Sequence, residues 1–219
     1  MRQSGLFQLA IYAHAGDHPQ ETEQEGSTIL VCNGQDGKYI GLARLAPLPK
    51  SPTNAVTYTP LGPKFADNLP TMQIKAVYLE RVATEDLLSQ VPKSPAINGA
   101  SYLGSAACLR CHQEAFTIWN SSAHAHATHT LENVKEDKDP ECVACHMVAV
   151  NRQSGFMSRS TTPSLENVGC ESCHGPASRH EQDPKIAMGK VGMQACLQCH
   201  IPQQSPNFDF AKYGIKIKH

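Results

Sequence analysis

The sequence predicts a chain in two parts: a small N-terminal α/β segment, and a C-terminal domain that is mostly helical or irregular. The first hundred residues contain runs typical of strands and one helical run. The remainder holds most of the Cys and His residues and as many basic as acidic side chains. Its few aliphatic clusters cannot offset the chain entropy by side-chain burial alone. We therefore expect another group to fill the interior of the second part.

Length and charge exclude several classes of protein. The 219 residues are enough for one domain or two small ones. The 19 Lys and Arg residues against 20 Asp and Glu residues give a formal net charge of −1. This balance offers no electrostatic basis for binding nucleic acid or an anionic membrane. The sequence contains no uninterrupted apolar stretch of about 18 residues, so we expect no transmembrane span.

The first part of the chain is predicted to cover residues 1–92. Residues 28–32 form a short run rich in β-branched side chains, 33–37 have the composition of a turn, and 38–45 form a second run. We expect these two runs to pair as a β-hairpin, and we expect one more strand at 55–58.

A helix and a linker are predicted next. Apolar residues recur at roughly helical spacing over residues 71–91, and Pro92 ends the run. Residues 93–100, with the sequence KSPAINGA, are predicted to form a linker. Residues 101–219 are then the second domain, in which short helices such as 113–130 alternate with polar loops.

One pattern occurs four times in the second domain: Cys, two other residues, Cys and His. This spacing is that of a c-type haem attachment site. The two thiols can form thioethers at one edge of a porphyrin, and the His then reaches the iron as proximal ligand. The thiols are those of Cys108 and Cys111, Cys142 and Cys145, Cys170 and Cys173, and Cys196 and Cys199; the proximal ligands are His112, His146, His174 and His200.

Two other uses of paired cysteines compete with haem attachment. Eight Cys in four pairs are enough for two Cys₄ zinc sites, and an even number of thiols is enough for disulfides. Neither explains why His follows the second Cys in all four copies. The sequence therefore predicts four haem c groups with their iron. Such haems are attached after export, so we expect a periplasmic or extracellular protein. The ninth thiol, Cys32, is predicted to be buried and free.

Each iron has a second axial position, which another imidazole can fill or which stays open to small molecules. On a helix over 113–130, His126 and His129 would share a face and His124 would point elsewhere. The residues alone leave the choice of distal ligand open among the seven remaining histidines. These are His14, His18, His124, His126, His129, His180 and His219.

Three stretches of the second domain together resemble the tetrahaem cytochrome c-554 family. The first is YLGSAAC followed by WNSSAHA, the second is VGCESCHGP with a His shortly after, and the third is NFDF followed by KIKH. The resemblance covers about residues 101–219. It implies a compact fold wrapped around four closely packed haems that shuttle electrons between redox partners. Trp119 would pack edge-on to a haem, or else in an ordinary core.

The resemblance also implies the ligands. Three histidines would bind irons of neighbouring haems as distal ligands, and the second haem, held by His146, would have none. His126 and His129 are the alternatives that would close this site. An open second haem would make the chain a redox enzyme acting on nitrogen oxides or hydroxylamine, which is the alternative to an electron carrier. The expected partners are donor and acceptor cytochromes or oxidoreductases. The implied distal ligands are His124, His180 and His219.

A weaker resemblance concerns residues 1–92. Residues 28–41 are similar to the closing strands of a calcineurin-like metallophosphoesterase. The motifs that hold two metals in such enzymes are absent, and their late His-x-His element would fall within 13–18. We expect a truncated remnant without phosphoesterase activity. Residues 2–15 match a signal peptide only faintly, which favours a missing upstream segment. Fusion to an upstream domain and assembly into oligomers both stay open.

Overall fold

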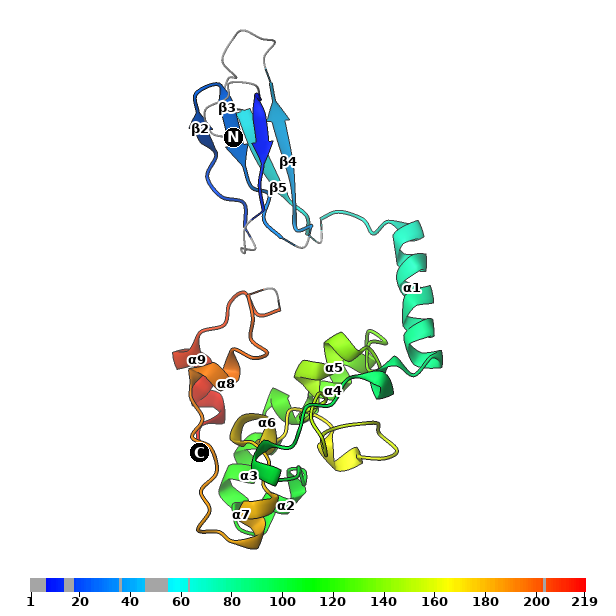
Figure 1. Ribbon diagram of the computed structural model, residues 1–219, viewed down its shortest axis with the longest axis vertical. Coiled ribbons are helices and arrows are strands. Elements are labelled where there is room, and N and C mark those ends of the chain that lie inside the picture. The colour runs from blue at the N-terminus through cyan, green and yellow to red at the C-terminus, as the bar shows by residue number, and fades with distance from the viewer. Residues whose placement is uncertain (1–6, 14–17, 36, 46–54, 63, 203) are drawn as a thin grey trace. The chain divides into compact units, whose positions relative to one another are not determined.

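The computed structural model describes residues 7–13, 18–35, 37–45, 55–62, 64–202 and 204–219. It divides into two compact units, Met1–Asn68 and Leu69–His219 (Figure 1). The first unit contains two small β-sheets, and the second is mostly helical. The mostly helical second part is thus confirmed, while the helix expected in the α/β first part belongs to the second unit. Haems as the core of the second part stay a prediction.

The first unit holds two separate sheets. In one sheet β3 lies in the middle, parallel to β1 and antiparallel to β2. In the other sheet β4 and β5 form an antiparallel pair. The strands are β1 (Leu9–Ile11), β2 (Glu23–Glu25), β3 (Thr28–Val31), β4 (Tyr39–Arg44) and β5 (Ala55–Pro60).

The predicted β-hairpin between residues 28–32 and 38–45 is wrong. Both edges of β3 are already occupied, one by β1 and the other by β2, so β4 has no free edge to pair with there. β4 pairs instead with β5, which lies where a further strand was expected. Ile29 and Val31 of β3 are buried, and the thiol of Cys32 is buried and free as predicted.

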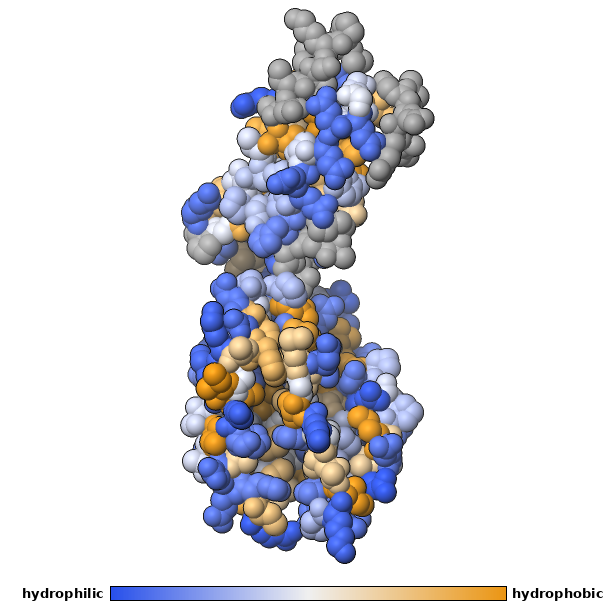
Figure 2. All heavy atoms as spheres, turned by 90° about the vertical axis from the view of Figure 1, so that its left-hand side faces the viewer, coloured by the Kyte–Doolittle hydropathy of each residue, from blue (hydrophilic) through white to orange (hydrophobic). Residues whose placement is uncertain are grey.

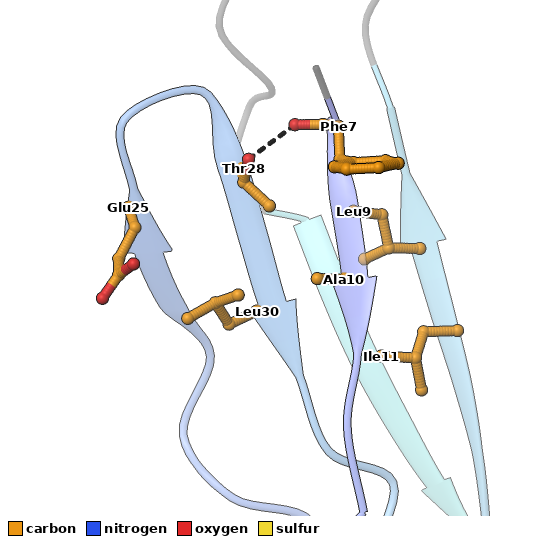
Figure 3. A pocket seen from close by; sticks show the side chains of 7 residues that line it. All are labelled: Phe7, Leu9, Ala10, Ile11, Glu25, Thr28 and Leu30. Carbon is orange, nitrogen blue, oxygen red and sulfur yellow. Dashed lines mark hydrogen bonds between the residues drawn. The ribbon is translucent and has the colours of Figure 1, made fainter. Parts of the chain in front are cut away.

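A hollow of about 240 Å³ lies against the three-stranded sheet (Figure 3). Its lining is apolar apart from Glu25 and Thr28, and the Thr28 hydroxyl donates a hydrogen bond of 2.6 Å to the carbonyl oxygen of Phe7. None of the predicted site residues contributes to this lining. The element His-x-His expected within 13–18 falls largely on residues outside those described, and His18 bonds to the Tyr39 hydroxyl at 2.6 Å.

The second unit consists of short helices joined by irregular segments, as expected from its polar, Cys-rich sequence. Only α1 is longer than eight residues among the described elements. The elements are α1 (Leu69–Thr84), η1 (Leu87–Gln90), η2 (Ile97–Gly99), α2 (Ala106–Leu109), α3 (Gln113–Asn120), η3 (Ala123–His126), α4 (Ala127–Glu132), α5 (Pro140–His146), η4 (Pro163–Leu165), α6 (Cys170–His174), α7 (Ser178–Gln182), α8 (Met193–Cys196), α9 (Phe210–Gly214) and η5 (Ile215–Ile217).

The helix predicted over 71–91 is present as α1 and η1, and both belong to the second unit. The helical run is interrupted at Asp86, whose φ of 48° is left-handed. Residues 93–100 are packed rather than loose, because Ser94 donates from its backbone to the Asn151 carbonyl oxygen at 2.8 Å. The Lys93 ammonium donates to the carbonyl oxygen of Val150. The division of the structure therefore precedes the linker predicted at 93–100, while the identity of the two domains stays a prediction.

The single helix expected over 113–130 is wrong: it is divided into α3, η3 and α4. The break lies at two serines whose side chains bond to the preceding turn. The Ser121 hydroxyl donates to the Ile118 carbonyl oxygen at 2.9 Å, and the Ser122 hydroxyl donates to that of Trp119 at 2.6 Å. Such bonds compete with the helical backbone pattern, and Ser122 is extended, with ψ of 161°.

An apolar cluster forms a side-chain core in one region of the second unit. It brings together η1, α4, α5 and the segment that follows α5, so side chains do fill part of the interior. Val143, inside the second Cys-x-x-Cys-His motif, is fully buried in it. The buried members are Leu88, Leu131, Val143, Met147, Val148, Val150, Phe156 and Leu165. In the described part of the chain, no helix is both long and apolar enough to cross a bilayer.

Phe156→Ala should destabilise this unit strongly. The Phe156 side chain is 1% exposed in the apolar cluster, and removing such a ring from a packed core costs about 3–5 kcal/mol. The free energy of unfolding, measured by urea denaturation, gives the answer. Met157→Ala is the matched control, because the neighbouring Met157 is 49% exposed and should cost less than about 0.5 kcal/mol. Equal losses for the two variants would contradict the assignment of this core.

Candidate functional site

Each of the four Cys-x-x-Cys-His motifs lies on or next to a short helix of the second unit. The second and third motifs lie within α5 and α6, and the first and fourth begin at the ends of α2 and α8. In the first, the His112 backbone N–H bonds to the Cys108 carbonyl oxygen at 2.9 Å, and His200 bonds to Cys196 in the same way at 2.8 Å. One helical turn thus brings the first Cys and the His of a motif to the same side of the backbone.

All nine cysteines are free thiols, and those of different motifs lie near one another. A hydrogen bond between Cys108 and Cys170 lowers the pKa of Cys170 to about 6. The corresponding bond between Cys145 and Cys199 lowers the pKa of Cys145 to about 7. The first motif therefore adjoins the third, and the second adjoins the fourth.

Three of the four proximal histidines face one of the histidines implied as distal ligands. The ring centroids lie 6.1 Å apart for His112 and His180, 6.0 Å for His124 and His200, and 5.9 Å for His174 and His219. Each pair joins segments far apart in the sequence, and no His is used twice among these three pairs.

This spacing is the one that two axial ligands of a single metal need. With about 2 Å for a metal–imidazole bond and about 1.1 Å from that nitrogen to the ring centre, imidazoles on opposite sides of a metal have centroids about 6.2 Å apart. The angle between the two ring planes can take any value in such a pair, because both planes contain the axis through the metal. Among the described residues, no three or more His, Cys, Asp or Glu side chains gather around one point as ligands of a bare ion.

The hydrogen bonds of the rings leave the other nitrogen available. In five of the seven histidines the Nδ1 atom lies 2.8–3.2 Å from a carbonyl or hydroxyl oxygen. Such a partner fixes the ring and directs Nε2 toward a metal. The partners are the carbonyl oxygens of Ala127 for His146, Gly189 for His174, Ile186 for His180 and Ile217 for His219, and the Ser205 hydroxyl for His200.

The environment of one pair favours neutral imidazole, which is the form that binds metals. Burial lowers the pKa of His124, with a smaller contribution from His200 in the same direction. Burial also lowers the pKa of His200. The Phe208 ring stacks on His200 at 4.3 Å between centroids and an interplanar angle of 14°, which restrains the orientation of this ring.

His146 differs from the other proximal histidines. Among the ring contacts of the described residues, none joins His146 to another imidazole. His126 and His129, the alternatives for closing this site, are both exposed. The His129 ring lies 3.1 Å from the Glu132 carboxylate, which in turn pairs with Arg159 at 2.5 Å.

Several apolar side chains around the first and fourth motifs are exposed. Leu109 is 42% exposed and Leu197 is 37% exposed, and Figure 2 shows apolar side chains at the surface of the helical unit. A hollow of about 350 Å³ adjoins the first motif, lined in part by Cys111, His112 and His219. A flat apolar group bound to the motifs would cover such surface. The donor set, the ring spacing and the uncovered apolar side chains therefore fit haem.

Trp119 is half-buried and takes part in ordinary packing. Its Nε1 donates to the Val168 carbonyl oxygen at 2.8 Å, and its ring lies 5.2 Å from that of Phe116. It thereby ties α3 to the segment that leads into the third motif. An edge-on contact with haem stays a prediction.

Sequence reasoning missed Glu171, the residue after Cys170 in the third motif. Its side chain is buried, at 2% exposure, and its carboxylate accepts hydrogen bonds from three backbone N–H groups. Burial raises the pKa of Glu171, while these backbone bonds act in the opposite direction. A signal was present in the sequence, because the other three motifs have Leu109, Val143 and Leu197 at this position.

Four Cys-x-x-Cys-His motifs, three of them with a second imidazole about 6 Å from the motif histidine, are the features of a c-type cytochrome. Residues 107–175 match the family model described as cytochrome c554 and c-prime. This match supports the predicted resemblance to the cytochrome c-554 family, a family that implies covalently bound haem c with its iron. The resemblance of residues 1–92 to a metallophosphoesterase has no support from this match and stays a prediction.

The chain is similar to one known protein sequence and to one solved structure. Over 148 residues the chain is 28% identical to cytochrome c-554 of Nitrosomonas europaea, with coverage of 52% of this chain and 63% of that protein. The match therefore spans less than two thirds of that relative. A solved structure of the reduced state of cytochrome c554 from the same organism aligns with 54% of this chain and 84% of that chain, at 21% identity and a TM-score of 0.45.

Proposed function

We propose that this chain is an electron-transfer protein that carries four covalently bound c-type haems and passes electrons between redox partners. The observation that carries the proposal is the spacing of 5.9–6.1 Å between three proximal histidines and the three histidines implied as distal ligands. Bound haem c would supply a one-electron couple at its iron. The chain's own residues attach the groups, ligate the irons and hold the ligands in place.

The attachment residues are the two thiols of each motif, and the proximal ligands are His112, His146, His174 and His200. Opposed imidazoles would keep an iron six-coordinate in both oxidation states, which suits electron transfer because little rearrangement is needed. The contacts between Cys108 and Cys170 and between Cys145 and Cys199 support close neighbours among the attached groups. The distal ligands are His180 for the first motif, His219 for the third and His124 for the fourth.

The attached haems determine the net charge that we expect for the loaded protein and its expected location in the cell. Each haem adds two propionates to a chain whose formal net charge is −1, so the loaded protein would be acidic. We therefore expect partners with basic surfaces, such as donor or acceptor cytochromes or oxidoreductases. Attachment of haem c after export makes the periplasm or the cell exterior the expected location.

Haem attachment to the full chain tests the proposal most directly. Material produced in a bacterium that matures c-type cytochromes should carry the mass of four haems on the eight motif thiols. Mass spectrometry and a haem-stained denaturing gel measure this. Cys32→Ala should leave the mass of bound haem unchanged, because Cys32 lies outside the motifs. Purified protein without covalent haem would refute the proposed function.

His124→Ala should convert one haem from low spin to high spin. Its ring faces His200 at 6.0 Å between centroids, so its loss would remove one distal ligand. Electron paramagnetic resonance of the purified protein measures the change. His18→Ala is the matched control, because His18 is exposed, lies in the first unit and bonds to the Tyr39 hydroxyl. Unchanged low-spin signals in His124→Ala would contradict this ligand assignment.

A second candidate function rests on His146. This histidine is the one proximal ligand without an opposed imidazole in the described ring contacts, so its haem would be open to a small ligand. The chain would then be a redox enzyme for a nitrogen oxide or hydroxylamine. The present observations favour the carrier, because three motifs have paired histidines and only one does not.

An open axial position at the haem of His146 leads to a separate prediction. Untreated wild-type protein should show one high-spin signal, and added nitric oxide should change that signal alone. Electron paramagnetic resonance before and after the addition is the measurement. A wholly low-spin spectrum would eliminate the enzyme, and a high-spin signal that appears only in His126→Ala or His129→Ala would identify the residue that closes the site.

A further inference from the structure

Glu171 connects two segments that are separate in the sequence. One carboxylate oxygen, Oε2, accepts hydrogen bonds from the backbone N–H of Leu103 at 2.9 Å and from that of Gly104 at 2.7 Å. The other, Oε1, accepts from the backbone N–H of Ala177 at 2.7 Å. Hydrogen bonds to an ionised acceptor are stronger than those between neutral groups, and the site excludes water, since Glu171 is 2% exposed.

Each of these segments leads directly to one histidine of an opposed pair. Leu103 and Gly104 precede α2, which leads through the first motif to His112. Ala177 is the residue before α7, which carries His180. The two imidazoles lie 6.1 Å apart between centroids. Glu171 thus touches neither ring, but it holds the backbone on both sides of the pair.

The backbone conformation near Glu171 directs N–H groups toward its carboxylate. Gly104 has a φ of 91°, a left-handed conformation that side chains disfavour. A Cβ atom there would clash with the Ser164 carbonyl oxygen. The N–H of Gly104 therefore reaches the carboxylate only because the residue is Gly.

A second link joins the same two segments. The Ser101 backbone N–H donates to the Ser178 hydroxyl at 2.8 Å, and the Ser178 backbone N–H donates to the Ser101 carbonyl oxygen at 3.2 Å. These bonds are exposed and lie at the surface, where the segment before α2 meets the start of α7. Glu171 is the buried link between the same two segments.

We propose that Glu171 is the positioning residue for the axial pair His112 and His180, with its carboxylate fixing the spacing of the two segments that carry them. The inference rests on the proposed function, because it concerns ligands of the first haem. A metal–imidazole bond is about 2 Å long, so a small displacement of α7 is enough to break it. Glu171 acts through the backbone and takes no part in electron transfer itself.

The test compares Glu171→Ala, Glu171→Gln and Glu181→Gln in the full, haem-loaded chain. Glu181→Gln is the matched control, because the exposed Glu181 also joins the two segments, through an ion pair of 2.9 Å with Arg110. Exposed ion pairs contribute little, so this variant should retain every low-spin signal. Mass spectrometry first counts the haems in each protein, and electron paramagnetic resonance then reports their spin states.

Glu171→Ala should keep four haems, lose one of the three low-spin signals and gain a matching high-spin signal. Added imidazole should restore low spin at this haem, and the unchanged signals of the other two pairs distinguish the loss of one ligand from general unfolding. Glu171→Gln keeps the shape of the side chain and one hydrogen-bond acceptor but turns an amide N–H toward a backbone donor. We therefore expect a smaller loss of the same low-spin signal. If Glu171→Ala does not attach its haems, Glu171→Gln tests the positioning role in its place. Unchanged signals, or equal loss of all three, would overturn the positioning role. Wild-type protein without haem would instead refute the proposed function.

Discussion

The second unit depends on one constraint: imidazoles from distant parts of the chain must face each other across about 6 Å. Helices of four to eight residues cannot maintain such a spacing alone, because helices this short are marginal in water. Cross-links between remote segments maintain it instead. The Glu171 carboxylate bonds to residues on both sides of the first pair, and the Cys170 backbone N–H bonds to the Ser105 hydroxyl at 3.1 Å. The histidines are thus positioned by buried polar bonds rather than by long helices.

The parts of the site that are local in sequence could be predicted from the sequence. A Cys-x-x-Cys-His motif is one helical turn, so its spacing determines which side chains share a side. The set of distal histidines came from a family resemblance, whereas their pairing came from the structure, because no rule of spacing links His124 to His200. Strand pairing failed for a related reason. Which strand takes an edge of β3 depends on β1 and β2, and a turn-like sequence between two runs carries no information about that competition.

Two kinds of interior meet in the second unit. The residue that follows the first Cys of each motif shows the difference between these two kinds of interior. Val143 is fully buried in the apolar cluster, whereas Leu109 and Leu197 are exposed. Side chains therefore complete the interior around the second motif and leave apolar surface uncovered around the first and fourth. The expectation that side chains contribute little was drawn from composition, which averages over both regions. Glu171 at the same position of the third motif follows neither pattern, and buried N–H donors explain it.

The break between α3 and η3 changes where the three histidines of this segment lie. On one continuous helix, His126 and His129 would share a face and His124 would lie elsewhere. The bonds of Ser121 and Ser122 to the preceding turn end α3, and the chain then continues as η3. His124 consequently lies half-buried beside His200, while His126 and His129 are exposed. The local structure around Ser121 and Ser122 thus separates His124 from the two exposed histidines that follow it.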